Sequence, residues 1–297
     1  MQLSEYTNCR LCARSCGVDR TLGGLGVCRV GADPVIARAA LHMWEEPPIS
    51  ATHGSGTVFF AGCSLGCIYC QNATISRAAY GKTVTIDRLS EIMLDLEGQG
   101  AHNINFVTPT HYAPSIIAAT RIARENGLTV PIVYNTSSYD TVETIRSLDG
   151  TVDIYLADYK YTLPRTAAAY SHAENYPDVA RAAIAEMVKQ KGCAVIEDGI
   201  TKSGVIVRVL LLPGHVAEAK LCVKYLYESY GDNVYISLMS QYTPMPGMPA
   251  PLDRPVTQAE YDELVDYAVK KGITNAFVQD GSSAKESFIP PFDNTGV

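Results

Sequence analysis

Two patterns of hydrophobic and polar residues alternate along the chain from about residue 56 onward. Short runs rich in β-branched and aromatic residues are typical of buried strands. They lie at 57–61, 104–108, 131–135, 152–157, 205–212, 234–239 and 275–279. Between these runs, apolar residues recur every three or four positions, which predicts amphipathic helices. The predicted helices lie at 85–100, 113–127, 140–148, 177–192, 216–231 and 257–272.

The alternation of strands and helices indicates parallel strands joined by helical crossovers, in either a barrel or a doubly wound sheet. Six or seven such units between residues 56 and 280 favour an α/β fold, an incomplete parallel (β/α)6-type, TIM-like barrel. We therefore expect four parts of the chain. They are a Cys-rich metal-binding segment at 1–31, a connector at 32–55, the partial barrel at 56–280 and a C-terminal tail at 281–297 that packs on the barrel.

Charge and hydropathy restrict the class of protein. The 297 residues include 24 Lys or Arg and 31 Asp or Glu, for a formal net charge of −7. An acidic chain without a basic run is poorly suited to binding duplex nucleic acid, which depends on neutralising phosphates. No apolar stretch is long enough to span a membrane, and the first residues lack the apolar centre of a signal peptide. We therefore expect a cytoplasmic protein with neither a membrane nor nucleic acid as its partner.

Nine cysteines in a cytoplasmic chain are expected to stay reduced rather than to form disulfides. Seven of them fall into two groups, a pattern that indicates metal or iron–sulfur binding. The groups are Cys9, Cys12, Cys16 and Cys28, and then Cys63, Cys67 and Cys70. Cys193 and Cys222 are isolated, and we expect them to be ordinary packed thiols.

The second group lies in "CSLGCIYC", directly after the first predicted parallel strand. That position corresponds to the rim of a parallel barrel where active sites are built. Each iron of a [4Fe–4S] cluster normally takes one cysteine, so three cysteines leave one iron open for another ligand. The alternative is a zinc site completed by a remote residue.

This spacing, with Tyr69 before the last cysteine, resembles the radical S-adenosylmethionine (SAM) superfamily. The segments "EEPPIS", "GCIYCQNATIS", "VTPTHY", "ADYKY", "LLLPGH" and "SLMSQYTP" are similar to its pyruvate formate-lyase activating enzyme-like (PflX-like) branch. The resemblance implies a [4Fe–4S] cluster whose open iron is chelated by SAM. It implies reductive cleavage of SAM to a 5′-deoxyadenosyl radical, with an electron donor of the flavodoxin or ferredoxin type.

The substrate implied by the resemblance to the activating enzymes is a glycine of a partner protein. A radical SAM reaction on a small molecule or a peptide is the first alternative. The second belongs to a different class, a non-catalytic iron–sulfur or zinc protein that acts as a redox sensor or scaffold.

The resemblance also suggests residues that bind SAM at the ends of the next strands. Thr108, Pro109 and Thr110 occupy the position where the superfamily often has Gly-Gly-Glu, so backbone carbonyls or threonine hydroxyls would replace the acidic contact. Asn135 and Ser137 suit the SAM carboxylate or ribose, although a simple polar turn has the same composition. Tyr69 and Gln241 are further candidates, and Tyr242 adjoins the latter.

Asp158 and Lys160 are similar to an Asp-x-Lys of the activating enzymes, which implies a monovalent cation beside the acid and a SAM carboxylate facing the lysine. An exposed ion pair is the alternative. Arg208 lies within an apolar strand, where a buried charge needs a partner. It either meets a carboxylate or ribose in the barrel or points outward to a helix acid. His111 and Arg208 are the candidate catalytic residues, with a backbone-bonded rim histidine as the alternative for His111.

The first cysteine group supplies four soft ligands within 20 residues, with Cys9 and Cys28 at its ends. Four cysteines suit a closed structural zinc site. They equally suit a second [4Fe–4S] cluster that delivers electrons. The spacing does not distinguish the two.

Overall fold

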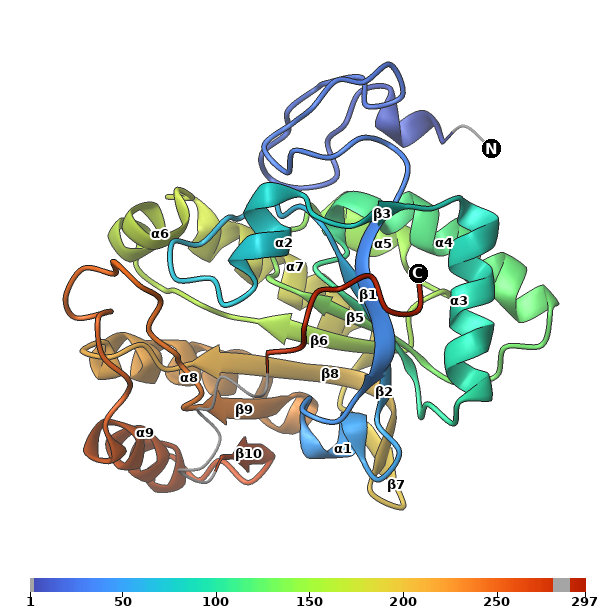
Figure 1. Ribbon diagram of the computed structural model, residues 1–297. Coiled ribbons are helices and arrows are strands. Elements are labelled where there is room, and N and C mark those ends of the chain that lie inside the picture. The colour runs from blue at the N-terminus through green and yellow to red at the C-terminus, as the bar shows by residue number, and fades with distance from the viewer. Residues whose placement is uncertain (1–2, 280–288) are drawn as a thin grey trace.

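The structure, a computed structural model, describes residues 3–279 and 289–297 (Figure 1). The described residues form one ten-stranded sheet with the order β10-β9-β8-β6-β5-β4-β2-β1-β3, and β7 pairs with β8 beside this path. The strands are β1 (Val35–His42), β2 (Ser55–Phe60), β3 (Lys82–Thr83), β4 (Ile104–Val107), β5 (Ile132–Thr136), β6 (Ile154–Asp158), β7 (Val195–Glu197), β8 (Ile200–Leu210), β9 (Tyr235–Met239) and β10 (Ala276–Val278).

The run from β2 to β10 is parallel, and its strands are the seven that the hydrophobic pattern predicts. The sheet path ends at β10 on one side and β3 on the other, so the described strands do not close into a full barrel. The predicted incomplete parallel α/β barrel is therefore confirmed. The ends of the parallel strands meet at one rim, which is where this architecture builds active sites.

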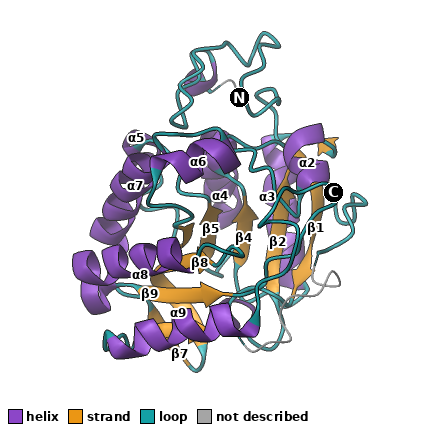
Figure 2. Cartoon of the chain, turned by 90° about the vertical axis from the view of Figure 1, so that its left-hand side faces the viewer, coloured by secondary structure: helices purple, strands orange, loops and turns teal. Residues whose placement is uncertain are grey.

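Helices connect the parallel strands and lie around the outside of the curved sheet (Figure 2). The six predicted helices correspond to α3 (Ile86–Gly98), α4 (Ala113–Glu125), α5 (Val142–Ser147), α7 (Tyr176–Lys191), α8 (Val216–Tyr230) and α9 (Gln258–Lys270). Helices α2 (Ala73–Ala78) and α6 (Pro164–Ser171) are short and were not indicated by the pattern. Among the described residues, no helix combines the length and the apolar character needed to cross a membrane.

The segment 32–55, expected to be a connector, contains β1 and the one-turn helix α1 (Pro47–Ser50). Strand β1 pairs antiparallel with β2 and extends the sheet beyond its parallel part. Ile49 of α1 is fully buried and packs with Val133, Leu156 and Ile206 of three central strands. This segment therefore enters the barrel and places the residues before α1 in its interior.

The two ends of the chain pack on different parts of the body. Residues 3–31 form a loop-rich segment with one short 3-10 helix (Ser4–Tyr6), at the top of Figure 1. The described part of the tail, 289–297, runs along β1, where the Ala39 amide donates to the Thr295 carbonyl at 2.9 Å. Asp293 pairs with Arg38 at 2.8 Å. Residues 281–288 of the predicted tail lie outside the described residues.

Candidate functional site

The loop that carries the second cysteine group follows β2 at the rim of the barrel. Gly62 and Gly66 have φ values of 82° and 67°, which favour glycine. A Cβ on Gly62 would lie 2.6 Å from the Cys28 carbonyl oxygen, so a side chain there would collide with the N-terminal segment. The two glycines allow the chain to turn tightly between its cysteines.

Two arginines hold the backbone of this loop. Arg14, from the N-terminal segment, donates to the carbonyls of Ser64 at 2.9 Å and Leu65 at 3.3 Å. Arg77, from α2, donates to the carbonyls of Cys67 and Ile68. These bonds give the loop carbonyls side-chain partners, and the Cys67 carbonyl also accepts from the Cys70 amide at 3.2 Å.

Each of the three sulfurs accepts a hydrogen bond. The donors are the Leu65 amide for Cys63 at 3.4 Å, the Ser171 hydroxyl for Cys67 at 3.0 Å and the Ser76 hydroxyl for Cys70 at 3.4 Å. Burial, together with the charges of the other two cysteines, raises the pKa of Cys63 to about 12. A metal would therefore have to displace the proton in order to bind this thiol.

The donor set fits an iron–sulfur cluster. It consists of soft thiols, and hydrogen bonds to the sulfurs are among the features that tune such clusters. No three His, Cys, Asp or Glu side chains of residues 3–279 and 289–297 surround a common point as a metal-ion site. The assignment of metals to the two cysteine groups accordingly stays a prediction from spacing and surroundings.

A chain of hydroxyl groups links Tyr69 to the middle cysteine. The Tyr69 and Tyr161 hydroxyls lie 2.7 Å apart, and that of Tyr161 lies 2.8 Å from the Ser171 hydroxyl. Ser171 then donates to Cys67. Tyr69, Tyr161 and Ser171 are all buried. Tyr69 is thus connected to the Cys67 sulfur through the hydroxyl groups of Tyr161 and Ser171.

Beside the cysteine loop is a cavity of about 240 Å³. Its lining includes Cys67 and Cys70 together with polar side chains from the ends of several strands. Six residues predicted to bind the cofactor lie in this lining, namely Tyr69, Asn135, Asp158, Lys160, Arg208 and Gln241. The cavity therefore joins the cysteines to most of the predicted cofactor residues.

Arg208 is the centre of a charged network at the base of the cavity. Its guanidinium donates to Asp158 at 2.8 Å, to the Asn135 side chain at 2.6 Å and to Glu45 at 3.3 Å. Lys160 donates to the other oxygen of Asp158 at 2.6 Å. Arg208 therefore points into the barrel, which is the first of the two arrangements expected from its apolar strand.

The network sets the charges of its members. Burial alone would raise the pKa of Asp158, but Arg208 and Lys160 outweigh it and hold that pKa below its usual value. Burial raises the pKa of Glu45 against the opposing effect of Arg208. Burial likewise raises the pKa of Glu46 to about 7. Both oxygens of Asp158 are already paired with cationic side chains, so the predicted monovalent cation would compete with them.

The family model described as "4Fe-4S single cluster domain" matches residues 53–162. This segment includes the three-cysteine loop and the strands β2, β4, β5 and β6. A sequence relative is the uncharacterized protein MJ0674 of Methanocaldococcus jannaschii. It is 28% identical over 250 residues, which cover 80% of this chain and 67% of MJ0674.

Two solved structures have similar folds. One is SuiB of Streptococcus suis bound to its precursor peptide SuiA, with a TM-score of 0.50 and 10% identity over 73% of this chain. The other is methylornithine synthase (PylB), with a TM-score of 0.51 and 14% identity over 72% of this chain. The chain spans 46% of the SuiB chain and 62% of the PylB chain. This chain therefore shares the fold of SuiB and of methylornithine synthase.

Some of the predicted site residues lie away from the cavity. Thr108, Pro109, Thr110 and Ser137 are not part of its lining. The Thr108 amide donates to the Asn135 carbonyl at 3.0 Å, and the Ser137 carbonyl accepts from a tyrosine hydroxyl. These residues support the ends of neighbouring strands, and their contact with SAM stays a prediction.

His111 is buried behind the cysteine loop. Its Nε2 donates to the Ala61 carbonyl at 2.8 Å. Burial, with the nearby charge of Arg20, lowers the pKa of His111 to about 3. The imidazole is therefore neutral at physiological pH, and it has the backbone bond expected of a rim histidine.

Three residues of the site were not among the predicted ones. Ser171 and Tyr161 reach Cys67 from α6 and the loop before it, and nothing in their local sequence indicates a role. Glu45 belongs to the segment "EEPPIS", in which two adjacent acids precede two prolines. An acidic pair beside apolar residues that enter a barrel is a signal that could have identified it.

Proposed function

We propose that the protein is a radical SAM enzyme whose [4Fe–4S] cluster is held by Cys63, Cys67 and Cys70. When bound, the cluster would supply the electron that cleaves SAM to a 5′-deoxyadenosyl radical, which abstracts hydrogen from a substrate. The observation that supports this most directly is that Cys67 and Cys70 line the same cavity as Asn135, Lys160 and Arg208. Thiol ligands and groups suited to a zwitterionic cofactor are thus adjacent.

Different residues of the cavity would bind and orient different groups of SAM. Lys160 is fixed by Asp158 and carries the positive charge that a carboxylate requires. Arg208, held by Asp158 and Glu45, keeps Asn135 oriented at the end of β5. Because these partners are ordered without a ligand, little side-chain ordering would be needed on binding.

For the substrate we propose hydrogen abstraction from a glycine of a partner protein, on the basis of the resemblance to the activating enzymes. Electron paramagnetic resonance after incubation with candidate partners would detect a glycyl radical. A reaction product on a small molecule or free peptide, without any protein radical, would favour the alternative substrate class. A flavodoxin- or ferredoxin-type protein is the proposed electron donor.

The central test compares wild-type protein with Cys67→Ala after anaerobic reconstitution with iron and sulfide. Dithionite and SAM are added, and 5′-deoxyadenosine is quantified by chromatography. Wild type is expected to release 5′-deoxyadenosine. The variant is expected to lose at least a hundredfold of that rate, because the middle sulfur of the cluster is removed.

Cys193→Ala is the matched control, because Cys193 belongs to neither cysteine group. Its activity should equal that of wild type. Reconstituted wild type that contains the cluster but forms no 5′-deoxyadenosine would contradict the proposal and favour a non-catalytic iron–sulfur protein. Undiminished cleavage by Cys67→Ala would contradict the assignment of this loop.

A further inference from the structure

A second cavity, of about 490 Å³, adjoins the one that contains the cysteines. The two cavities share part of their lining, which consists of Trp44, Glu45, Arg208, Met239 and Gln241. Most of the remaining lining comes from the segment after β1 and from β9 and β10, which lie towards opposite ends of the sheet path. The second cavity therefore lies at the side of the barrel, between α1 and β10 in Figure 1, where the described strands do not close.

Glu46 lines the second cavity with a carboxylate oxygen that lacks a hydrogen bond. The residue is 6% exposed and belongs to the lining of the second cavity but not to that of the first. Within residues 3–279 and 289–297, its Oε2 atom has no hydrogen-bond partner. Leaving a buried charged acceptor unsatisfied is costly. This oxygen is therefore available to accept a hydrogen bond from a molecule that enters the second cavity.

The charged network behind Glu46 has more acids than cations. Arg208 pairs with Asp158 at 2.8 Å and with Glu45 at 3.3 Å, whereas Glu46 lies 4.0 Å from its Nη1 atom. Lys160 pairs with Asp158 at 2.6 Å. In the described part of the chain, these three acids thus share two cations, and Glu46 has the longest contact. A cation that entered the second cavity would balance the remaining negative charge.

The rest of the second cavity suits a long aliphatic side chain. Apolar side chains make up much of its wall, among them Met43, Pro47, Met239 and Phe277. Methionine side chains are flexible and adapt to the shape of a ligand. Lysine and arginine can lay their apolar stem along such a wall and place their charge against a carboxylate. Met43 and Val278 are 44% and 59% exposed, so the cavity opens at the surface, where a polypeptide could insert a side chain.

We propose that the second cavity binds a lysine or arginine side chain of a polypeptide substrate, with Glu46 as its counter-charge, and so holds that substrate beside the SAM cavity. The cation would donate a hydrogen bond to the Oε2 atom of Glu46. The shared wall at Glu45 and Arg208 brings the bound substrate next to the cofactor. This inference rests on the proposed function, because it names the class of substrate that the SAM-derived radical attacks.

The first test uses Trp44, the single tryptophan of the chain, as a reporter because it lines the second cavity. Full-length wild type is titrated at pH 8 with acetyl-Gly-Lys-Gly-amide, and tryptophan fluorescence is followed. The norleucine peptide, acetyl-Gly-Nle-Gly-amide, has the apolar stem without the ammonium group. We expect the lysine peptide to bind at least tenfold more tightly than the norleucine peptide. Equal affinities, or no saturable change with either peptide, would overturn the proposal.

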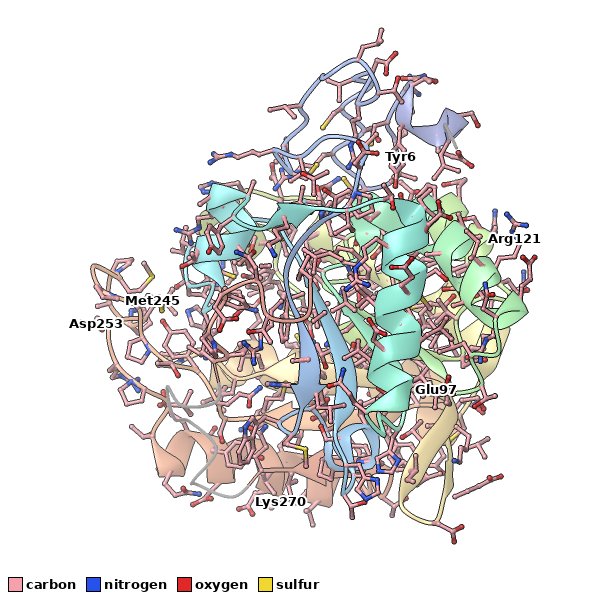
Figure 3. The ribbon with its side chains drawn as sticks, turned by 45° about the vertical axis from the view of Figure 1, so that its right-hand side comes forward. Tyr6, Glu97, Arg121, Met245, Asp253 and Lys270 are labelled. Carbon is pink, nitrogen blue, oxygen red and sulfur yellow. The ribbon has the colours of Figure 1, made fainter. Side chains whose placement is uncertain are left out.

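The second test assigns the preference for a cation to Glu46. In Glu46→Gln, the ratio of the two affinities should fall to about one, while the affinity for the norleucine peptide stays at the wild-type value and so shows that the cavity is intact. Glu125→Gln is the control, because Glu125 pairs with Arg121 on the surface of α4 (Arg121 is labelled in Figure 3). It should keep the wild-type ratio. A wild-type ratio in Glu46→Gln would overturn the role of Glu46.

A small amine is the other possible source of the cation. Titration of wild type with n-butylamine distinguishes the two, because this amine has the stem and the charge but no peptide backbone. We expect n-butylamine to bind at least tenfold more weakly than the lysine peptide. Equal affinities would contradict a polypeptide occupant and would favour a small amine as the substrate.

The third test links the occupant to the radical. Reconstituted wild type is incubated with SAM, dithionite and the lysine peptide deuterated at its carbon atoms. The 5′-deoxyadenosyl radical would take one deuterium atom, so that a C–D bond breaks in the peptide and another forms at the 5′ carbon. Mass spectrometry of 5′-deoxyadenosine measures this transfer, which should decrease at least tenfold in Glu46→Gln at a peptide concentration below saturation.

The outcomes of the third test separate the two proposals. Unlabelled 5′-deoxyadenosine from wild type saturated with the peptide would overturn the placement of the substrate beside the cofactor. Absence of any 5′-deoxyadenosine would instead contradict the proposed function. The fluorescence titrations need neither SAM nor a reductant, so their result stands in either case.

Discussion

The Ser171 hydroxyl donates a hydrogen bond to the Cys67 sulfur over 3.0 Å, and Ser171 is fully buried. Hydrogen bonds to cluster sulfurs stabilise the more negative, reduced state and so raise the reduction potential. Ser171→Ala removes the bond without adding volume. A hydrogen bond is worth about 1 kcal/mol, which corresponds to a decrease on the order of 40 mV for a one-electron couple. Redox titration monitored by electron paramagnetic resonance would measure this decrease in reduction potential.

Ser147→Ala is the matched control for this change. The Ser147 hydroxyl donates to the Thr144 carbonyl on α5 at 2.7 Å, away from the cysteine loop. The reduction potential of the cluster in Ser147→Ala should equal that in wild type. A Ser171→Ala potential equal to that of Ser147→Ala would show that the Ser171 hydroxyl does not act on the cluster.

Replacing Arg208 should destabilise the fold far more than replacing a surface arginine. Arg208 is the shared ion-pair partner of Asp158 and Glu45, so Arg208→Met leaves these buried carboxylates with less positive charge to balance them. Breaking a buried ion pair by removing one partner costs about 3–5 kcal/mol. We expect a decrease of that size in the free energy of unfolding, measured by urea denaturation monitored by circular dichroism.

Arg121→Met provides the comparison, since Arg121 pairs with Glu125 on the surface of α4 with both side chains 62% exposed. Exposed pairs of this kind contribute about 0.5 kcal/mol or less. Equal decreases in the free energy of unfolding in Arg208→Met and Arg121→Met would refute a structural role for the Arg208 network. Adding Asp158→Asn to Arg208→Met should restore part of the lost stability, because one uncompensated charge is then removed.

Much of the fold follows from local pattern, because the continuous apolar runs of β2, β4, β5 and β6 reflect their burial on both faces. The pattern missed β1, since its position depends on pairing with β2 and the strand contains Arg38 among its apolar residues. It also missed Ser171, because the contact with Cys67 spans 104 positions and depends on where α6 packs. Cysteine spacing identified both thiol groups, yet the burial of Arg20 beside one of them emerged only in three dimensions.

The acid Glu46 should make stability depend on pH. Burial raises its pKa from 4.5 to about 7 in the folded state, against the opposing effect of Arg208. The contribution of Glu46 to the free energy of unfolding is therefore fully present below pH 4.5 and is lost as the pH rises through 7. Glu46→Gln cannot ionise. We expect the stability of this variant relative to wild type to increase between pH 4.5 and 7, by roughly 3 kcal/mol in total, and then to level off.

Urea denaturation at pH 5, 6, 7 and 8 would measure this difference. Glu125→Gln, an exposed change on α4, controls for the general effect of removing a negative charge. A constant difference between Glu46→Gln and wild type across this range would show that Glu46 ionises normally in the folded protein.

His111 should remain neutral far below the pH at which histidine usually titrates. Its Nε2–H bond to the Ala61 carbonyl defines the tautomer, and its buried Nδ1 has no partner. Burial and Arg20 lower its pKa from 6.5 to about 3, so its contribution to stability is full above pH 6.5 and falls as the pH decreases towards 3. Nitrogen-15 NMR of labelled histidine should show a neutral Nε2–H ring from pH 5 to 8, with His111→Gln assigning the signal. A protonation midpoint near pH 6.5 would contradict the buried placement and would restore His111 as a proton donor.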